Sequence, residues 1–125
     1  MPSAMDRSLA KHLAIHLAPG ALLELATIPR FGTQLPLFRH APPSLAHFLA
    51  HFSAQHGDAP FLVDGETRLS FAECHAAAQS LAEALVASRG VAKGERIGIA
   101  ARNSANWAIV YMAVLMAGGC ATLLN

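Results

Sequence analysis

The stretch that decides the fold is "RIGIAARNSANWAIVYMAVLMAGGCATLL", which runs from Arg96 to Leu124. It opens with a β-prone run over 96–101 and continues with a helix that Asn103 or Ser104 would cap. The helix is apolar nearly all round, which predicts that other elements cover it on both sides. After Gly118 and Gly119, the uncharged run "CATLL" is typical of a parallel strand buried on both faces. Strand, helix and strand at this spacing predict a βαβ unit and therefore an α/β fold.

Three further elements can be predicted upstream of this unit. Ser70 and Glu73 match a capping box, and the helix that they begin keeps apolar residues on one face until Gly90 ends it. We expect this helix to cross over into the strand at Arg96, which gives a βαβαβ unit with a mostly parallel sheet flanked by helices. The apolar face of this helix consists of Cys74, Ala78, Leu81 and Leu85.

The two remaining elements are a hairpin and a short helix. Asp64–Gly65 lies between two β-prone runs and predicts a short hairpin. A helix that begins at Ser44 and ends near Gly57 carries a single apolar stripe. The stripe consists of Leu45, Phe48, Leu49 and Phe52.

The first 43 residues differ in character from the rest of the chain. Residues 1–18 can form a helix, 19–43 look irregular, and Pro42–Pro43 closes this leader. We therefore divide the chain into a leader over 1–43 and an incomplete α/β subdomain over 44–125. Ligands of open α/β sheets bind beyond the carboxyl ends of the strands, and the chain stops at Asn125, where such a functional loop would begin. This position predicts that the sequence is the start of a longer chain.

The composition excludes several classes of function. The chain is 54% hydrophobic and 14% charged, so it carries more surface to bury than a free-standing domain of this size, and we expect residues outside it to complete the core. Its net charge of +1 comes from scattered basic residues, which argues against nucleic-acid binding. Cys74 and Cys120 match no metal or redox spacing and are interpreted as reduced core residues of a cytoplasmic protein.

Two apolar segments could be mistaken for targeting or membrane signals. The leader contains His12, His16 and Glu24 and a Pro-Gly break, which argue against a cleaved signal peptide. The uncharged run over 107–124 is long enough for a membrane span, but two adjacent glycines divide it into a helical part and a β-prone part. Membrane contact is therefore not expected.

No residue pattern within the chain marks a catalytic centre. The pairs His12/His16 and His47/His51 have helical i, i+4 spacing, but neither pair encloses a glutamate or has a placed third ligand. The glycines form no phosphate-binding loop, and Ser44, Ser70 and Ser104 precede helices and are interpreted as caps. We expect no catalytic, cofactor-binding or metal-binding residue in this chain.

Three motifs in register resemble a known family. "LSFAEC", Leu69 to Cys74, is similar to the first core motif of the AMP-forming acyl-CoA synthetases, an adenylate-forming superfamily that includes adenylation domains and luciferase. "LMAGGCATLLN", Leu115 to Asn125, resembles the second core motif, and the stretch between them resembles the family's Gly-Val-x-x-Gly-Asp and Asn-Ser segments. The resemblance covers residues 44–125. Met116, Leu124 and Cys74 depart from the family's usual Lys, Pro and Leu, which are packing substitutions.

The resemblance implies both a fold and a reaction. Members use Mg-ATP to convert a carboxylic acid to an acyl adenylate, and a thiol such as that of coenzyme A then takes the acyl group. The family's phosphate-binding loop, its ribose-binding Asp and its catalytic Lys all follow the second motif. This chain is therefore expected to be the N-terminal, structural portion of an ATP-dependent acid–CoA ligase for a fatty or aryl acid. It should be inactive alone, with the remainder of its own chain as its partner.

Two alternatives from other functional classes stay open at this point. The chain could be a stand-alone, non-enzymatic interaction module that associates through an exposed apolar strand and its leader helix. It could also be a peripheral membrane protein that uses the leader helix, although that helix has only Arg7 and Lys11 as basic residues and a modest apolar face. An unpaired, uncharged final strand predicts self-association in any of these cases.

Overall fold

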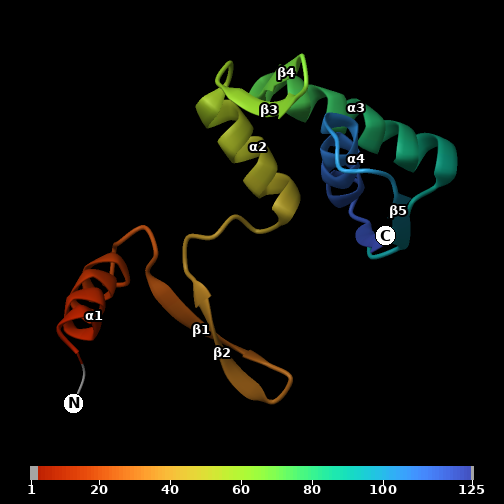
Figure 1. Cartoon of the computed structure of the whole chain (residues 1–125). Helices are drawn as coiled ribbons and strands as arrows, with labels where there is room; N and C mark the ends of the chain where they lie inside the picture. The colour runs from red at the N-terminus through yellow and green to blue at the C-terminus, as the bar shows by residue number, and fades with distance from the viewer. Residues whose placement is uncertain (1–2, 125) are drawn as a thin grey trace. The chain divides into compact units, whose positions relative to one another are not determined.

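A computed structural model describes residues 3–124, which fall into two compact units divided after Pro42. The first unit contains helix α1 (Ala4–His16) and strands β1 (Leu25–Arg30) and β2 (Thr33–Phe38) (Figure 1). The second unit contains helices α2 (Leu45–His56), α3 (Phe71–Arg89) and α4 (Ala105–Met116), and strands β3 (Pro60–Asp64), β4 (Thr67–Ser70), β5 (Arg96–Ala100) and β6 (Cys120–Leu124). Each unit is described below by itself.

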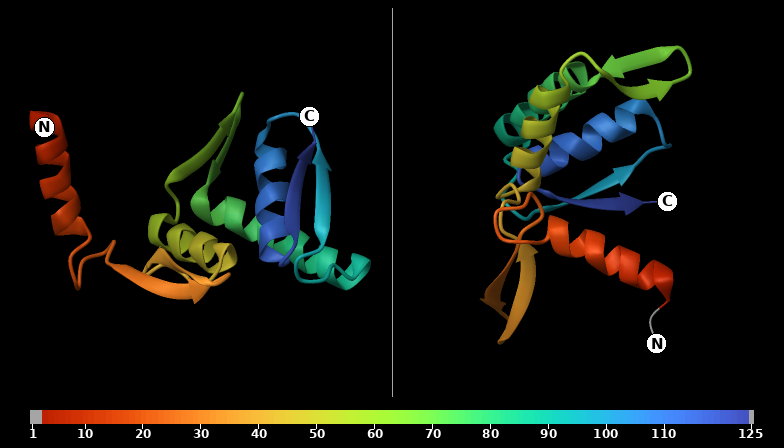
Figure 2. Two further views of the ribbon diagram at one scale, coloured as in Figure 1. Left: turned by 90° about the horizontal axis from the view of Figure 1, so that it is seen from below. Right: turned by 90° about the vertical axis from the view of Figure 1, so that its left-hand side faces the viewer.

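The βαβ unit predicted from the 96–124 stretch is confirmed. β5 and β6 pair in parallel, in a register that runs from Arg96 opposite Cys120 to Ala100 opposite Leu124. α4 connects the two strands and lies beside them (Figure 2). Its N-cap is Ser104, whose side chain accepts a hydrogen bond from the backbone N–H of Trp107 at 3.1 Å. The α/β class therefore follows from this stretch alone.

The capping box predicted for α3 is also confirmed. The backbone N–H of Glu73 donates to Ser70 Oγ at 3.1 Å, and the backbone N–H of Ser70 donates to Glu73 Oε2 at 2.8 Å. Gly90 ends the helix in the left-handed conformation with φ of 65°. Because both ends of α3 are specified locally, its bounds could be read from the sequence.

The short hairpin predicted at Asp64–Gly65 is confirmed, whereas the mostly parallel sheet is confirmed only for β5 and β6. β3 and β4 form an antiparallel hairpin of their own, so α3 joins two separate strand pairs and is not a crossover within one sheet. Among residues 3–124 the strands form three pairs, of which only β5–β6 is parallel. The hairpin carries Asp64, Glu66 and Arg68, and charged side chains of this kind suit an exposed antiparallel ribbon better than a parallel strand buried on both faces.

The core of the second unit lies between α3 and α4. Cys74, Ala78 and Ala82 are buried at intervals of four residues along α3, where they face the buried Met112 and Ala113 of α4. Small side chains at these positions let the two helices approach closely. The predicted face of α3 is confirmed, because Leu81 and Leu85 pack against the same cluster and are half-buried.

Two burial predictions for the end of the chain are wrong. Cys74 is fully buried as expected, but Cys120 is exposed. β6 was expected to be buried on both faces, yet Leu123 and Leu124 are 51% and 52% exposed. The physical reason is that β6 is covered by α4 and paired with β5 alone among the described residues, so much of its apolar surface faces solvent.

The first unit corrects the expectation that 19–43 is irregular. The helix predicted over 1–18 is present as α1, whereas β1 and β2 form a regular antiparallel hairpin from Leu25 opposite Phe38 to Arg30 opposite Thr33. Two features hide this hairpin in the sequence. Each strand contains a proline, Pro29 or Pro36, and the strands are apolar on both faces and so lack the usual alternation.

No helix within residues 3–124 combines the length and the apolar character that a membrane crossing demands. The uncharged run over 107–124 is instead divided between α4 and β6, with Gly118 at φ of 82° in the turn between them.

Candidate functional site

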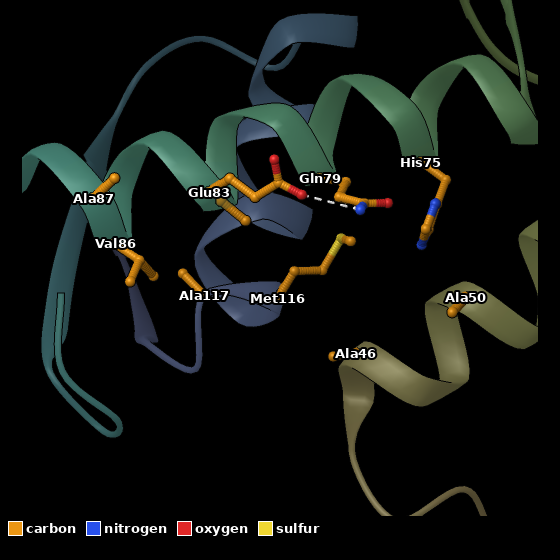
Figure 3. Close-up of a pocket in the computed structure, with 10 residues that line it drawn as sticks. Ala46, Ala50, His75, Gln79, Glu83, Val86, Ala87, Met116 and Ala117 are labelled. Atoms are coloured by element: carbon orange, nitrogen blue, oxygen red, sulfur yellow. Dashed lines mark hydrogen bonds between the residues drawn. The ribbon is translucent and has the colours of Figure 1, made fainter.

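An open groove of about 580 Å³ lies along one side of α3 in the second unit (Figure 3). α2 and the C-terminal end of α4 form its other walls. Half of the lining residues are alanine, so few polar side chains reach the groove. The lining residues are Ala46, Ala50, His75, Gln79, Ala82, Glu83, Val86, Ala87, Met116 and Ala117.

The polar groups of this groove come from successive turns of α3. Gln79 and Glu83 are four residues apart, and Gln79 Nε2 donates to Glu83 Oε1 at 3.0 Å. This is the ordinary i, i+4 pairing of a helix surface, so the two side chains satisfy each other. The pair leaves His75 as the other polar side chain in the groove.

His75 holds a polar atom whose hydrogen-bonding capacity is unused. Its Nε2 is buried and has no hydrogen-bond partner in the part of the chain that the structure describes. The ring lies between α3 and α2, where it also borders a smaller hollow beside Ser53. A buried imidazole nitrogen without a partner is costly, which marks this face of α3 as one that another group would complete.

A second hollow lies at the carboxyl ends of the parallel strands, where open α/β sheets bind ligands. It has a volume of about 460 Å³ and is lined by Ala100, Ala101, Arg102, Asn103 and Leu124. Next to it, the carboxylate of Asp64 accepts a hydrogen bond from the backbone N–H of Ala105 at 3.0 Å. Asp64 therefore joins the β3–β4 hairpin to the first turn of α4, a long-range tie that no local sequence pattern indicated.

The N-termini of α3 and α4 do not fit a nucleotide phosphate. Ser104 and the carboxylate of Asp64 take backbone N–H groups at the start of α4, and Ser70 and Glu73 do the same at the start of α3. A carboxylate at these positions repels a phosphate group, which would otherwise use the same donors. These two N-termini therefore offer no free cradle for a phosphate group.

The residues also do not fit a metal ion. Within residues 3–124, no three His, Cys, Asp or Glu side chains come together as a set that could hold one. The helical histidine pairs make local contacts instead: His12 Nδ1 lies 2.8 Å from the carbonyl oxygen of Ser8, and His47 Nδ1 lies 2.7 Å from Ser44 Oγ. No step that involves Mg²⁺ can be assigned to these residues. The expectation that the chain carries no catalytic, cofactor-binding or metal-binding residue stays a prediction.

Cys74 is a buried cysteine in the core, and the surroundings of its thiol disfavour the reactive thiolate form. Burial raises the pKa of the Cys74 thiol, and the negative charge of the neighbouring Glu73 raises it further. The Glu73 carboxyl has the opposite shift: hydrogen bonds from the backbone and side chain of Ser70 lower its pKa. Both residues have a structural place, Cys74 in the α3–α4 core and Glu73 in the capping box of α3.

The structure places both family-like motifs at junctions between elements. "LSFAEC" runs from the end of β4 through the capping box into α3, and residues 115–124 of the second motif run from the end of α4 through the glycine turn into β6. Sequence reasoning identified these junctions but missed Asp64 and His75 as site residues. No sequence pattern predicts the burial of His75, because this burial depends on how α2 packs on α3.

Comparison with known proteins gives a consistent set of relatives. The family model described as AMP-binding enzyme matches residues 49–125. The medium/long-chain-fatty-acid–CoA ligase FadD6 of Mycobacterium tuberculosis is 36% identical over 73 residues, which make up 58% of this chain and 12% of that protein. This chain therefore spans only a small part of the length of its relatives.

Solved structures agree with this match. O-succinylbenzoate coenzyme A synthetase (MenE) from Bacillus subtilis, in complex with AMP, has a TM-score of 0.59 and 29% identity, over 62% of this chain and 20% of that chain. The N-terminal domain of FACL13 from Mycobacterium tuberculosis has a TM-score of 0.61 and 21% identity, over 66% of this chain and 21% of that chain. The second of these likenesses concerns the fold alone.

Proposed function

Because the chain belongs to the AMP-binding enzyme family, we propose that it is the N-terminal, structural portion of an ATP-dependent acid–CoA ligase. The observation that carries this proposal is the family match over residues 49–125, in a chain that spans 12% of FadD6 and 20% of MenE. The complete ligase would join a carboxylic acid to coenzyme A through an acyl adenylate. The acid is of the fatty or aryl type, as the printed names of FadD6 and MenE suggest.

The part that this chain plays in such an enzyme is structural. The α3–α4 core and the β5–β6 pair form a small scaffold, and the N-termini of α3 and α4 are occupied by the chain's own carboxylates. The ATP, Mg²⁺ and coenzyme A of the complete enzyme would then be held by residues outside 1–125. We place the complete enzyme in the cytoplasm.

The surfaces left open in the second unit are where the rest of the enzyme would pack. The alanine-lined groove carries the unpartnered Nε2 of His75, and β6 exposes about half of Leu123 and Leu124. An apolar strand and a buried, unsatisfied imidazole are both stabilised when further polypeptide covers them. The two surfaces support the proposal that the partner of this chain is the remainder of its own polypeptide.

Pyrophosphate release tests the proposal. The 125-residue chain should release no pyrophosphate from ATP with fatty or aryl acids, whereas a polypeptide that continues from Asn125 to the length of FadD6 should do so. A matched control is the longer polypeptide with His75→Ala, which should keep its substrate preference because His75 lies in the scaffold. Acid-dependent pyrophosphate release by the 125-residue chain itself would overturn the structural role.

A further inference from the structure

The tip of the β1–β2 hairpin presents an aromatic side chain in an unfavourable backbone conformation. Phe31 and Gly32 form the turn with φ of 51° and 75°, and within residues 3–124 Phe31 is the one residue other than glycine with positive φ. Such two-residue turns favour Asn-Gly, since a bulky residue is strained in the left-handed region. Phe31 is nevertheless 88% exposed, so its ring gains almost no burial within its own unit. Because no contact within the unit compensates for the strained backbone of Phe31, we infer that its ring contacts something outside the unit.

The edges of the hairpin are closed to strand addition. The backbone N–H of Arg39 donates to the carbonyl of Glu24 at 2.7 Å, so this opposed pair is a hydrogen-bonded one. Since hydrogen-bonded and non-hydrogen-bonded pairs alternate along an antiparallel ribbon, Pro29 and Pro36 both fall in non-hydrogen-bonded pairs. The backbone nitrogen at these positions faces outward, and proline has no N–H to offer there. One proline on each edge therefore blocks a further strand.

The two faces of the hairpin are apolar and open to solvent. Leu25 opposite Phe38 lies on one face, at 44% and 46% exposed, and Ile28 opposite Leu35 lies on the other, at 40% and 38%. An antiparallel ribbon commonly has one apolar face packed on a core and one polar face in water. Apolar character on both faces and at the tip suits immersion in an apolar medium.

Charge at the tip indicates which medium this is. The Arg30 guanidinium lies over the Phe31 ring at 5.3 Å from its centroid, so a cation and an aromatic ring share the same end of the ribbon. Residues 1–42 contain four Lys or Arg and two Asp or Glu, whereas residues 43–125 contain five and six. An aromatic ring beside a guanidinium suits the boundary between acyl chains and anionic headgroups.

α1 adds a second apolar surface in the same unit. Met5, Leu9 and Leu13 are four residues apart and therefore share one side of the helix, at 80%, 58% and 45% exposed. α1 has no buried residue.

From the tip, the edges, the faces and the charge we propose that residues 3–42 bind the surface of an anionic lipid bilayer, with Phe31 inserted below the headgroups and Arg30 paired with lipid phosphate. The hairpin lies at the surface and does not cross the bilayer. This proposal rests on the first unit alone and is independent of the ligase assignment, which rests on residues 49–125.

Flotation with lipid vesicles tests this proposal on the complete 125-residue chain. Flotation is preferred to sedimentation because aggregated protein sinks while vesicle-bound protein rises. The vesicles contain phosphatidylcholine alone or phosphatidylcholine with phosphatidylserine. The decisive variant is Phe31→Asn, since asparagine favours the left-handed turn and keeps the hairpin while it removes the aromatic ring. Val63→Thr, at an exposed apolar position of β3, is the matched control.

The chain should float with phosphatidylserine vesicles, and added salt should weaken this binding. Phe31→Asn should lower the partition coefficient by about tenfold, as expected for the loss of one buried aromatic side chain, and Val63→Thr should leave it unchanged. A chain that stays with neither vesicle type would overturn the proposal and indicate that a protein covers this unit. Equal binding by the parent chain and Phe31→Asn would overturn the role of the tip.

Discussion

Replacing Gly119 by alanine should destabilise the second unit more than the same change at Gly98. A Cβ at Gly119 would lie 3.0 Å from Ile97 Cδ1, 3.1 Å from Val114 Cγ1 and 3.1 Å from the carbonyl oxygen of Val114. That carbonyl already accepts the backbone N–H of Gly119 at 2.9 Å, so the turn from α4 into β6 is fixed. The added methyl group would therefore require three neighbours, one of them a backbone carbonyl, to move by a few tenths of an ångström.

Gly98 is the matched control because a Cβ there would meet only the flexible side chain of Leu124. A Cβ there would meet Leu124 Cδ1 at 3.1 Å, which is the far end of a side chain that is 52% exposed and can rotate away. Both changes remove the same flexibility from the unfolded chain, which favours folding by about 0.4–1 kcal/mol. Overpacking at Gly119 costs about 1–3 kcal/mol, so Gly119→Ala should lose about 1–2 kcal/mol in free energy of unfolding, and Gly98→Ala should change little.

Thermal unfolding followed by circular dichroism and by the fluorescence of Trp107, the single tryptophan, measures the difference. A loss of 1 kcal/mol corresponds to about 4–8 °C in Tm for a unit of this size. If Gly119→Ala is as stable as Gly98→Ala, the close approach of the turn to Val114 does not exist and the β5–α4–β6 packing is wrong.

Three further results are expected from the same chain. In urea denaturation, Asp64→Ala should lower the free energy of unfolding by about 1 kcal/mol, because the backbone N–H of Ala105 loses its carboxylate partner at the start of α4. Asp64→Asn should keep most of this stabilisation, and equal stability of the two variants would contradict the contact between Asp64 and Ala105. The hydrogen bonds from Ser70 hold the pKa of Glu73 in the folded chain below its usual value near 4.5, so Glu73 stabilises the fold above that pH and this stabilisation is lost as pH falls through the folded pKa. Glu73→Gln should therefore flatten the acid side of a plot of Tm against pH, and an unchanged acid side would show that Glu73 makes no such contribution. Light scattering should detect dimers or larger species that Leu123→Lys reduces, because β6 exposes an apolar edge, and a monodisperse monomer of the parent chain would count against self-association.

The elements with local signals were predictable from the sequence. α3 has a capping box at one end and a left-handed glycine at the other, and α4 has a serine cap and continuous apolar character. These signals depend on residues within a few positions of each helix end, so no tertiary information was needed. The parallel pairing of β5 with β6 followed because a short helix between two apolar runs permits few other arrangements.

The errors concern one sheet connection, one missed hairpin and the burial of single side chains. The β3–β4 hairpin was predicted, but the pattern of a strand specifies a face and leaves open whether a further strand joins it, so the separation of this hairpin from β5 could not be predicted. The β1–β2 hairpin was missed because Phe31–Gly32 replaces the usual Asn-Gly and because proline stands in both strands. The exposure of Cys120 and the burial of His75 Nε2 depend on packing between elements distant in the sequence.

We propose that residues 1–125 supply a scaffold in which the N-termini of α3 and α4 are already occupied and which binds no nucleotide. Isothermal titration calorimetry of the 125-residue chain with Mg-ATP measures such binding. No saturable heat is expected at millimolar nucleotide, because Asp64 and Glu73 occupy the donors that phosphate would use. Stoichiometric binding with a micromolar Kd would contradict it.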